Sequence, residues 1–336
     1  MLASLIVPTR NKAAFLARTL TSLEHQSHDA IEVVIVDDGS EDDTRDVVRA
    51  FRALDIRYIR RAHRGRAAAR NAAIRAARGD LLVFCDDDRL ADPHFVRDHV
   101  AAHRGRTTPL VALGQQRGVL TSWCRAWHLP IAPLLARRPE LAAQLTGSIV
   151  ELASCDALRT SFAATVADLE QPEPWWELHV APAVAAFGSD LAGCAFRWTL
   201  GVTGNLSVMR AAAERVGLFD ETFVGWGLED TDFHYRLDLA GADTRVLDGG
   251  LNYHQLHERG HDHVREWGLN ALRMLDKYDS VELGLYLRAI RQELTFGEAN
   301  QIALELAAAT IPTLRAELIR VTRDYFRLLA SVTLNA

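Results

Sequence analysis

The sequence predicts an α/β fold, in which a mostly parallel, Rossmann-like sheet is flanked by helices and followed by a C-terminal helical annex. Between residues 4 and 84, short runs rich in β-branched residues alternate with amphipathic segments. The runs are apolar throughout, which is typical of strands covered on both faces. Polar motifs follow three of these runs, at the strand ends where ligands of such sheets bind.

The elements follow in chain order. The predicted strands share a short apolar run and lie at 5–7, 33–36, 56–59 and 81–84. The predicted helices share apolar residues at helical spacing or a high alanine content, and lie at 15–23, 47–51 and 67–78. After about residue 108 the strand signal weakens and residues 120–165 read as mostly helical. Two or three amphipathic helices are expected after residue 263.

Composition excludes several classes of protein. With 336 residues, 49% hydrophobic and 24% charged, the chain is that of an ordinary globular protein, and its net charge of −6 argues against a nucleic-acid partner. The four cysteines are scattered without a short paired spacing, which predicts reduced thiols. No apolar run is long enough for a signal peptide or a transmembrane segment, so we expect a cytoplasmic protein.

Asp86, Asp87 and Asp88 directly follow the apolar run Leu81–Cys85, which contains the predicted strand at 81–84. Three adjacent carboxylates repel one another, so a cation is expected beside them. Mg²⁺ and Mn²⁺ prefer oxygen ligands and can in turn hold a diphosphate. The alternative interpretation is a solvated acidic loop.

Two further motifs end the first two strands. Pro8, Thr9 and Arg10 follow the first, and Asp38 follows the second in Asp37-Asp38-Gly39-Ser40. Asp38 could accept a hydrogen bond from a base or ribose. The alternative is turn and cap chemistry, with Asp42 or Asp43 capping the next helix.

Eight arginines lie between residues 57 and 78. They lack interleaved aromatics, so we expect most of them on the wet face of a helix rather than on nucleic acid. Arg70 is the candidate to point inward, toward a phosphate or an aspartate.

A second acidic pair stands in the segment 223–237. Trp226 lies between two glycines that permit close backbone approach, and its ring can stack on a sugar. Glu229 and Asp230 then open a predicted helix, where one carboxylate can accept a proton while the other orients a substrate. The alternative is a core tryptophan and acids that favour the helix dipole.

Four histidines cluster farther on, at 254, 257, 261 and 263. Such a cluster resembles a zinc site, but the upstream carboxylates favour a harder ion whose shell is completed by a histidine, with His257 and His254 as the candidates.

These motifs, in this order, resemble the GT-A glycosyltransferases of family 2, over roughly residues 3–100 and 200–260. The segments that carry the resemblance are Ser4–Asn11, Val36–Ser40, Ala69–Asn71, Gly79–Asp80, Phe84–Asp88, and Phe219–Glu221 with Gly225–Asp230. The last, GWGLED, is closest to the C-terminal motif of galactosyltransferases and N-acetylgalactosaminyltransferases. The resemblance implies a nucleotide-diphosphate sugar donor, Mn²⁺ or Mg²⁺, and inversion at the anomeric carbon.

The resemblance also implies roles for the donor-side residues. Asp38 matches the nucleobase-contacting aspartate, flanked by Pro8, Thr9 and Arg10. Asp86 and Asp88 match the two ends of the metal motif. Asp88 is the ion ligand, and Asp86, a further candidate ligand, lies nearer the ribose, with Asp87 between them on the donor side. Two positions depart from the family pattern: His63 stands where an asparagine is usual, and Arg10 where a tyrosine is frequent.

On the acceptor side, Asp230 matches the catalytic base, and Glu229 matches the residue that grips the acceptor beside Trp226 and Gly227. His257 matches the metal-binding histidine of the galactosyltransferases. His254 stands where those enzymes carry a methionine ligand, and also fits the tyrosine-histidine-glutamine pattern of chondroitin polymerases.

The resulting prediction is an inverting hexosyltransferase that uses a UDP-sugar and a carbohydrate, peptide or small-molecule acceptor. We expect a GT-A domain at 1–262, with a nucleotide-binding half at 1–108 and an acceptor half at 109–262. A helical extension at 263–336 could mediate a homodimer. The alternatives are a nucleotidyltransferase, against which the lack of glycine after the first strand argues, and a non-catalytic nucleotide-sugar or carbohydrate-binding protein.

Overall fold

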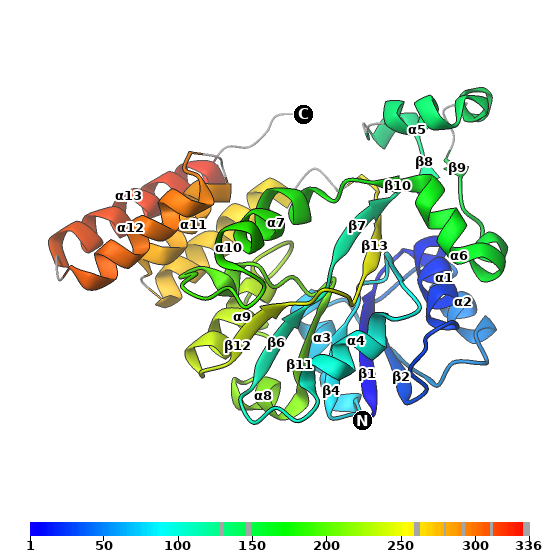
Figure 1. Ribbon diagram of the computed structural model, residues 1–336, viewed down its shortest axis with the longest axis horizontal. Coiled ribbons are helices and arrows are strands. Elements are labelled where there is room, and N and C mark those ends of the chain that lie inside the picture. The colour runs from blue at the N-terminus through cyan, green and yellow to red at the C-terminus, as the bar shows by residue number, and fades with distance from the viewer. Residues whose placement is uncertain are drawn as a thin grey trace.

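The computed structural model describes residues 1–127, 129, 131–145, 149–258, 263–278, 280–290, 293–309 and 312–331. Its centre is a seven-stranded sheet (Figure 1). In spatial order the strands are β12 (Asp243–Val246), β6 (Leu110–Leu113), β11 (Leu206–Met209), β4 (Leu81–Phe84), β1 (Ala3–Thr9), β2 (Ile31–Asp37) and β3 (Ile56–Arg60). Strand β11 is antiparallel to both neighbours, and the other pairs are parallel. The predicted α/β class and the first four strands are confirmed.

Helices cover both faces of this sheet. One face packs on α1 (Ala13–Leu23), α2 (Thr44–Ala50) and α4 (Phe95–His103), and the other on α3 (Arg66–Ala76), α8 (Arg210–Arg215) and α9 (Glu229–Leu239). Neighbouring residues of a strand point to opposite faces. Thus Leu5 and Val7 are buried against the first group, and Ile6 against the second. This explains the uniformly apolar strands.

A second sheet lies beside the carboxyl ends of the main strands. Its order is β10 (Glu170–Gln171), β7 (Gln116–Val119), β13 (Asn252–Gln255) and β5 (Arg89–Ala91), and a two-stranded pair joins β8 (Ser122–Trp123) to β9 (Val150–Glu151). Strands thus continue after residue 108, where the sequence signal for them weakens. These strands have two to four residues, too few for a periodic pattern to distinguish them.

The segment 120–165 is mostly helical, as expected, with α5 (Ala132–Arg137) and α6 (Cys155–Leu169) linked by short 3₁₀ turns at Arg125–Trp127 and Pro139–Gln144. A π-helical turn at Trp176–Val180 leads into α7 (Ala181–Phe187). Between α7 and β11, one further 3₁₀ turn spans Arg197–Thr199. Asp43 is the N-cap residue of α2, but its side chain makes no capping hydrogen bond. Asp42, one residue earlier, accepts from Thr44 N at 3.2 Å instead.

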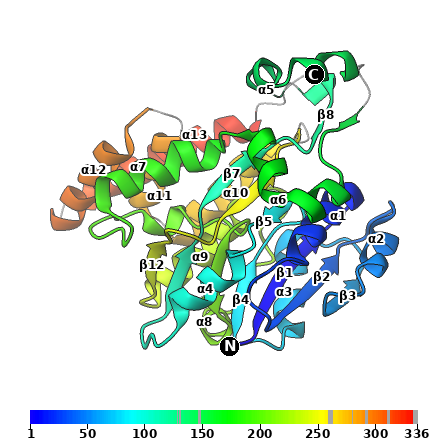
Figure 2. The same cartoon turned by 45° about the vertical axis from the view of Figure 1, so that its right-hand side comes forward.

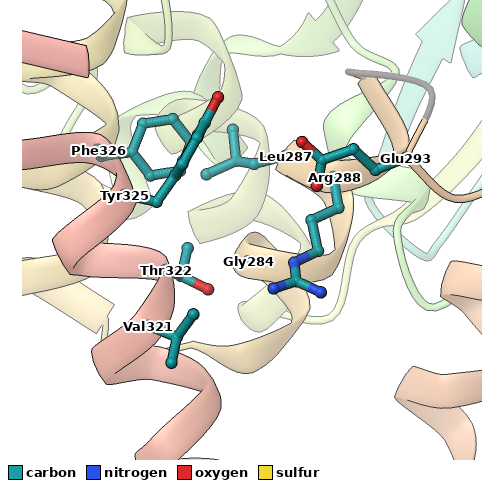
Figure 3. A pocket seen from close by; sticks show the side chains of 8 residues that line it. All are labelled: Gly284, Leu287, Arg288, Glu293, Val321, Thr322, Tyr325 and Phe326. Carbon is teal, nitrogen blue, oxygen red and sulfur yellow. The ribbon is translucent and has the colours of Figure 1, made fainter. Parts of the chain in front are cut away.

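The described part of the C-terminal region contains four helices, one or two more than predicted: α10 (His263–Tyr278), α11 (Val281–Ile290), α12 (Phe296–Ala308) and α13 (Pro312–Ser331). They pack on one another and on α7, away from α1 and α2 (Figures 1 and 2). A hollow of about 100 Å³ lies between α11 and α13 (Figure 3), well below the roughly 300 Å³ of small ligand pockets. In the regions described, no helix has the length and apolar character needed to cross a membrane.

Candidate active site

Acidic residues gather where the main sheet meets the second sheet. Asp38 directly follows β2, and the triplet Asp86–Asp88 follows β4 after one intervening residue, Cys85. Strand β13 pairs antiparallel with β5 and sets His254 opposite Arg89, the residue after the triplet. Strand pairing therefore brings the distant histidine segment to the aspartates.

Asp88, His254 and His257 form a group that could hold a metal ion. One ligand atom from each lies within 4.8 Å of the others. Asp88 Oδ2 is 3.0 Å from His257 Nε2 and 3.9 Å from His254 Nε2. Both predicted histidines thus join the cluster. The carboxylate of Asp86, also predicted as a ligand, lies outside it.

The second nitrogen of each histidine is held by an acceptor. His254 Nδ1 is 2.9 Å from Glu173 Oε2, and His257 Nδ1 is 2.8 Å from the carbonyl of Glu258. Each Nδ1 therefore carries the proton, and each Nε2 presents a lone pair toward Asp88. Burial lowers the pKa of His254 and favours the neutral ring that ligates metals. This donor set fits a divalent cation.

Glu173 was missed from sequence. It is 3% exposed and lies between Pro172 and Pro174, in a short loop after β10. No spacing connects it to His254, which lies on another strand.

Lys12, also missed, inserts its ammonium into the cluster. Its Nζ lies 2.5 Å from Asp88 Oδ2, 2.9 Å from His257 Nε2 and 3.6 Å from Asp87 Oδ1. Burial alone would lower the pKa of Lys12, but Asp88 and Asp87 raise it above its usual value. The available signal was its place directly after the first strand-end motif.

The neighbouring aspartates titrate differently. Burial raises the pKa of Asp87 to about 6, although Lys12 opposes the shift. Burial acts in the same direction on Asp88, but the charge of the Lys12 ammonium outweighs it and holds the pKa of Asp88 well below the usual range. Asp88 therefore stays ionised and available to a cation.

Arg70 points inward, as predicted, and is 3% exposed. Its Nη1 donates to Glu229 Oε1 at 2.8 Å, and its Nη2 donates to Asp86 Oδ1 at 3.0 Å. Of the two roles considered, the structure shows the carboxylate contact. Arg70 thereby joins the strand-end triplet to the acidic pair that opens α9.

The adjacent Asn71 performs a purely structural task. Its side-chain amide donates to the Phe219 carbonyl at 2.9 Å, and its Oδ1 accepts from Phe219 N at 2.8 Å. This pair of hydrogen bonds fixes α3, which carries Arg70, against the segment that leads to Trp226.

Asp230 has the features of a general base. It is half-buried in the first turn of α9, and its Oδ1 accepts from Thr231 N at 2.8 Å. Burial and the charge of Glu229 raise its pKa to about 7, although Arg70 opposes the shift. A carboxylate with that pKa can take up a proton near neutral pH.

Trp226 is half-buried rather than part of the core, and its indole meets His263 edge-on at 5.7 Å. The flanking Gly227 has φ +93°, and a Cβ there would lie 2.8 Å from Trp267 Cδ1 on α10. Close approach by α10 therefore explains this glycine, where a ligand was expected. His261 lies outside the described residues.

Asp38 is 4% exposed and accepts from Gly65 N at 2.7 Å and Arg64 N at 3.0 Å. His63 Nδ1 also lies 2.7 Å from Asp38, and His63 Nε2 lies 3.0 Å from Arg10 Nη1. The two positions that depart from the family pattern thus contact each other, and His63 also contacts the predicted base-binding aspartate.

Pro8 and Thr9 precede this group at the end of β1. Pro8 is half-buried and Thr9 is buried, whereas Arg10 is exposed. The predicted donor residues therefore lie along one edge of the sheet, formed by the carboxyl ends of β1, β2 and β4.

Two family models match the chain. Residues 4–147 match glycosyl transferase family 2, and residues 185–261 match the family described as the N-terminal domain of galactosyltransferase. Together they span the strand-end motifs, the acidic pair and both histidines.

Curated relatives agree. The chain is 35% identical over 286 residues to validoxylamine A glucosyltransferase of Streptomyces hygroscopicus subsp. jinggangensis, covering 83% of this chain and 62% of that protein. It is 33% identical over 291 residues to the uncharacterized glycosyltransferase YfnE of Bacillus subtilis, covering 84% of this chain and 71% of that protein. Hyaluronan synthase of Pasteurella multocida is 31% identical over 259 residues, which cover 75% of this chain and 24% of that protein.

Solved structures share the fold at low identity. A crystal structure of S. aureus TarS 1–349 has a TM-score of 0.53 at 18% identity, covering 98% of this chain and 90% of that one. The mannosyltransferase PcManGT of Pyrobaculum calidifontis, in complex with GDP-Man and Mn²⁺, has a TM-score of 0.51 at 18% identity, covering 98% of this chain and 83% of that one. The sheet is thus that of GT-A glycosyltransferases, and by its motifs and relatives the chain belongs to glycosyl transferase family 2.

Proposed function

We propose that this glycosyltransferase moves a hexosyl unit from a UDP-sugar to an acceptor hydroxyl, with inversion and with help from a divalent ion. The observation that carries the proposal is the arrangement at one sheet edge of two chemically distinct acidic groups. Asp88 is held ionised beside the Nε2 atoms of His254 and His257, while Asp230 has its pKa raised to about 7. The first suits a cation and the second suits proton transfer.

On the donor side, Asp38 and Arg10 would contact the base while Asp86 and Asp87 face the ribose and diphosphate. Uracil offers one N–H donor between two carbonyl acceptors, which suits a carboxylate beside a guanidinium. Relatives support a nucleotide-sugar donor: S. aureus TarS has been crystallised with UDP-GlcNAc and PcManGT with GDP-Man.

Asp88, His254 and His257 would hold the ion. When bound, it would neutralise charge on the departing diphosphate, which is the largest electrostatic contribution to such a transfer. Two imidazoles in the set favour Mn²⁺ over Mg²⁺, because Mg²⁺ takes almost only oxygen ligands. Glu173 would keep His254 in the ligating tautomer.

Asp230 would remove the proton from the acceptor hydroxyl as that oxygen attacks the anomeric carbon. Attack assisted by one base, on the side opposite the diphosphate, inverts the configuration. Glu229, fixed by Arg70 through Oε1, would orient the acceptor through its other oxygen, and Trp226 would stack on a sugar ring.

An open groove of about 620 Å³ supports acceptor binding by residues 109–262. Its polar lining includes Arg117, Glu170, Glu173, Trp176 and Glu177. Polar groups around an aromatic side chain suit a hydroxyl-rich molecule. Glu173 belongs both to this groove and to the support of His254, so the acceptor would lie beside the metal cluster.

The domain division at 108 and 262 stays a proposal, as does a homodimer through the C-terminal helices. Leu304, Leu314 and Leu328 are exposed on those helices and could contribute to such an interface. The chain spans only part of the longest relatives, so its acceptor and partners are proposed for the residues at hand.

The test is to incubate the purified chain with UDP-glucose, UDP-galactose, UDP-GlcNAc or UDP-GalNAc and to measure released UDP, with Mn²⁺ or with a chelator. We expect release with at least one donor, and loss of release when the ion is removed. Release that is equally fast with the chelator would refute the metal role. Absence of binding to every UDP-sugar, measured by thermal shift, would refute the donor class.

A further inference from the structure

We propose that Lys12 is an internal counter-cation of the metal site, which competes with the divalent ion and makes ion binding depend on the donor diphosphate. The inference rests on the proposed function for the identity of that donor. The inference goes beyond the proposed function because it assigns a role to Lys12, which belongs to neither acidic motif.

The ammonium lies where the ligand atoms converge. Lys12 Nζ contacts Asp88 Oδ2 at 2.5 Å and His257 Nε2 at 2.9 Å, and these are two of the three ligand atoms in the cluster. A divalent ion bound there would need the same lone pairs. Lysine and ion therefore exclude each other.

The hydrogen-bonding groups of the cluster require a cation between His257 and Asp88. An ammonium can only donate, so His257 Nε2 must be the acceptor in its contact with Lys12. His257 Nε2 and Asp88 Oδ2 are then two acceptors 3.0 Å apart. Such a pair is stable only with a positive group between them. Lys12 supplies it here, and a metal ion would supply it otherwise.

The residue type agrees with this task. Lys12 and Lys277 are the only lysines in a chain with 38 basic residues. An ammonium is a compact point charge, whereas a planar guanidinium needs a fork of acceptors. Lys12 precedes α1 at its N-cap position, and its side chain is 26% exposed, so it can leave toward solvent without unfolding the helix.

Charge then couples the ion to the donor. A divalent ion that displaces Lys12 frees an ammonium beside Asp86 and Asp87, where the proposal seats the diphosphate. The diphosphate carries two negative charges and would accept the freed ammonium. An ion that binds without UDP must therefore break the contacts of Lys12, and nothing replaces them for the ammonium. When UDP binds with the ion, its diphosphate gives the ammonium new contacts. Binding of the two should be cooperative, and reciprocally so.

The test is calorimetric titration of Mn²⁺ into the full chain and into Lys12→Met, each with and without UDP. A charge-assisted hydrogen bond has the strength of about one to two decades in affinity, so Lys12→Met should bind Mn²⁺ about 10- to 100-fold tighter than the parent when UDP is absent. When UDP is present, the advantage of Lys12→Met over the parent in Mn²⁺ affinity should shrink or reverse. Lys12→Arg, which keeps a cation, and Lys277→Met, which removes one elsewhere, should not tighten binding. Unchanged or weaker Mn²⁺ binding by Lys12→Met without UDP would overturn the proposal.

A second measurement uses the unmodified chain, in case Lys12→Met folds poorly. Acetylation of the two lysines, followed by mass spectrometry, reports whether each amine is free. Mn²⁺ without UDP should speed labelling of Lys12 severalfold and leave Lys277 unchanged, and equal rates with and without Mn²⁺ would contradict the displacement. If the parent binds Mn²⁺ and Lys12→Met binds it no better, only this inference fails. If neither protein binds Mn²⁺ with or without UDP, the metal role in the proposed function fails as well.

Discussion

Replacing Asp230 by asparagine tests the proposed chemistry most directly. Asparagine has nearly the same shape and cannot accept the acceptor proton, so transfer should slow by about 10² to 10⁴, the usual contribution of a general base. At about 1.4 kcal/mol per decade, this corresponds to about 3–6 kcal/mol of barrier. Asp276→Asn, an exposed carboxylate on α10 whose side chain is 67% accessible, is the matched control and should leave the rate unchanged.

The pH dependence sharpens this test. The pKa of Asp230 is raised to about 7, and only the ionised form can act as a base. Activity of the parent should therefore fall below pH 7, roughly tenfold for each further unit. Asp87 titrates nearby, with a pKa of about 6, so Asp87→Asn serves to separate the two groups.

The assay is kcat/KM for UDP release between pH 5 and 9, with saturating Mn²⁺. The fall in kcat/KM at acidic pH should persist in Asp87→Asn, and it should be absent from the residual activity of Asp230→Asn. If Asp230→Asn transfers sugar at the parent rate, or keeps the same acidic descent, Asp230 is not the base.

Three further outcomes are expected. Asp88→Ala should lower kcat by more than about 100-fold and abolish the rise in melting temperature caused by Mn²⁺, because it removes the ionised ligand; persistence of that rise would contradict the cluster. Glu173→Gln should weaken Mn²⁺ binding by about 10- to 100-fold, since His254 loses its orienting carboxylate, whereas the exposed Glu177→Gln should leave the titration unaltered. Asp230→Asn should have a higher melting temperature than the parent at pH 8 but not at pH 4. The pKa of Asp230 in the folded state, about 7, lies above its unfolded value, so the parent loses stability as the pH rises between the two values. Equal melting temperatures at pH 8 would refute the raised pKa.

Much of the fold follows from local pattern alone. The strand that contains Leu5, Val7 and their neighbours is apolar because both faces are covered, and alternation with helices then makes the sheet parallel. Parallel strands bring their carboxyl ends to one edge, so Asp38 and Asp88 could be assigned to one site before any coordinates. The family resemblance added roles for Asp230 and His257 that spacing could not supply.

Contacts between distant segments were decided only by the tertiary structure. Lys12, Glu173 and His63 lie in no common periodic pattern, and each acts through a residue brought near by strand pairing or by a loop. Their significance depends on distances of about 3 Å, which a linear pattern cannot encode. The pKa of Asp230 is likewise a property of its surroundings, because burial and a neighbouring charge raise it. Sequence alone thus determined the first four strands of the sheet, its reactive edge and the acidic motifs, since these follow from residue period and strand direction. Folding decided which lone pairs face one another, and therefore which cation they accept.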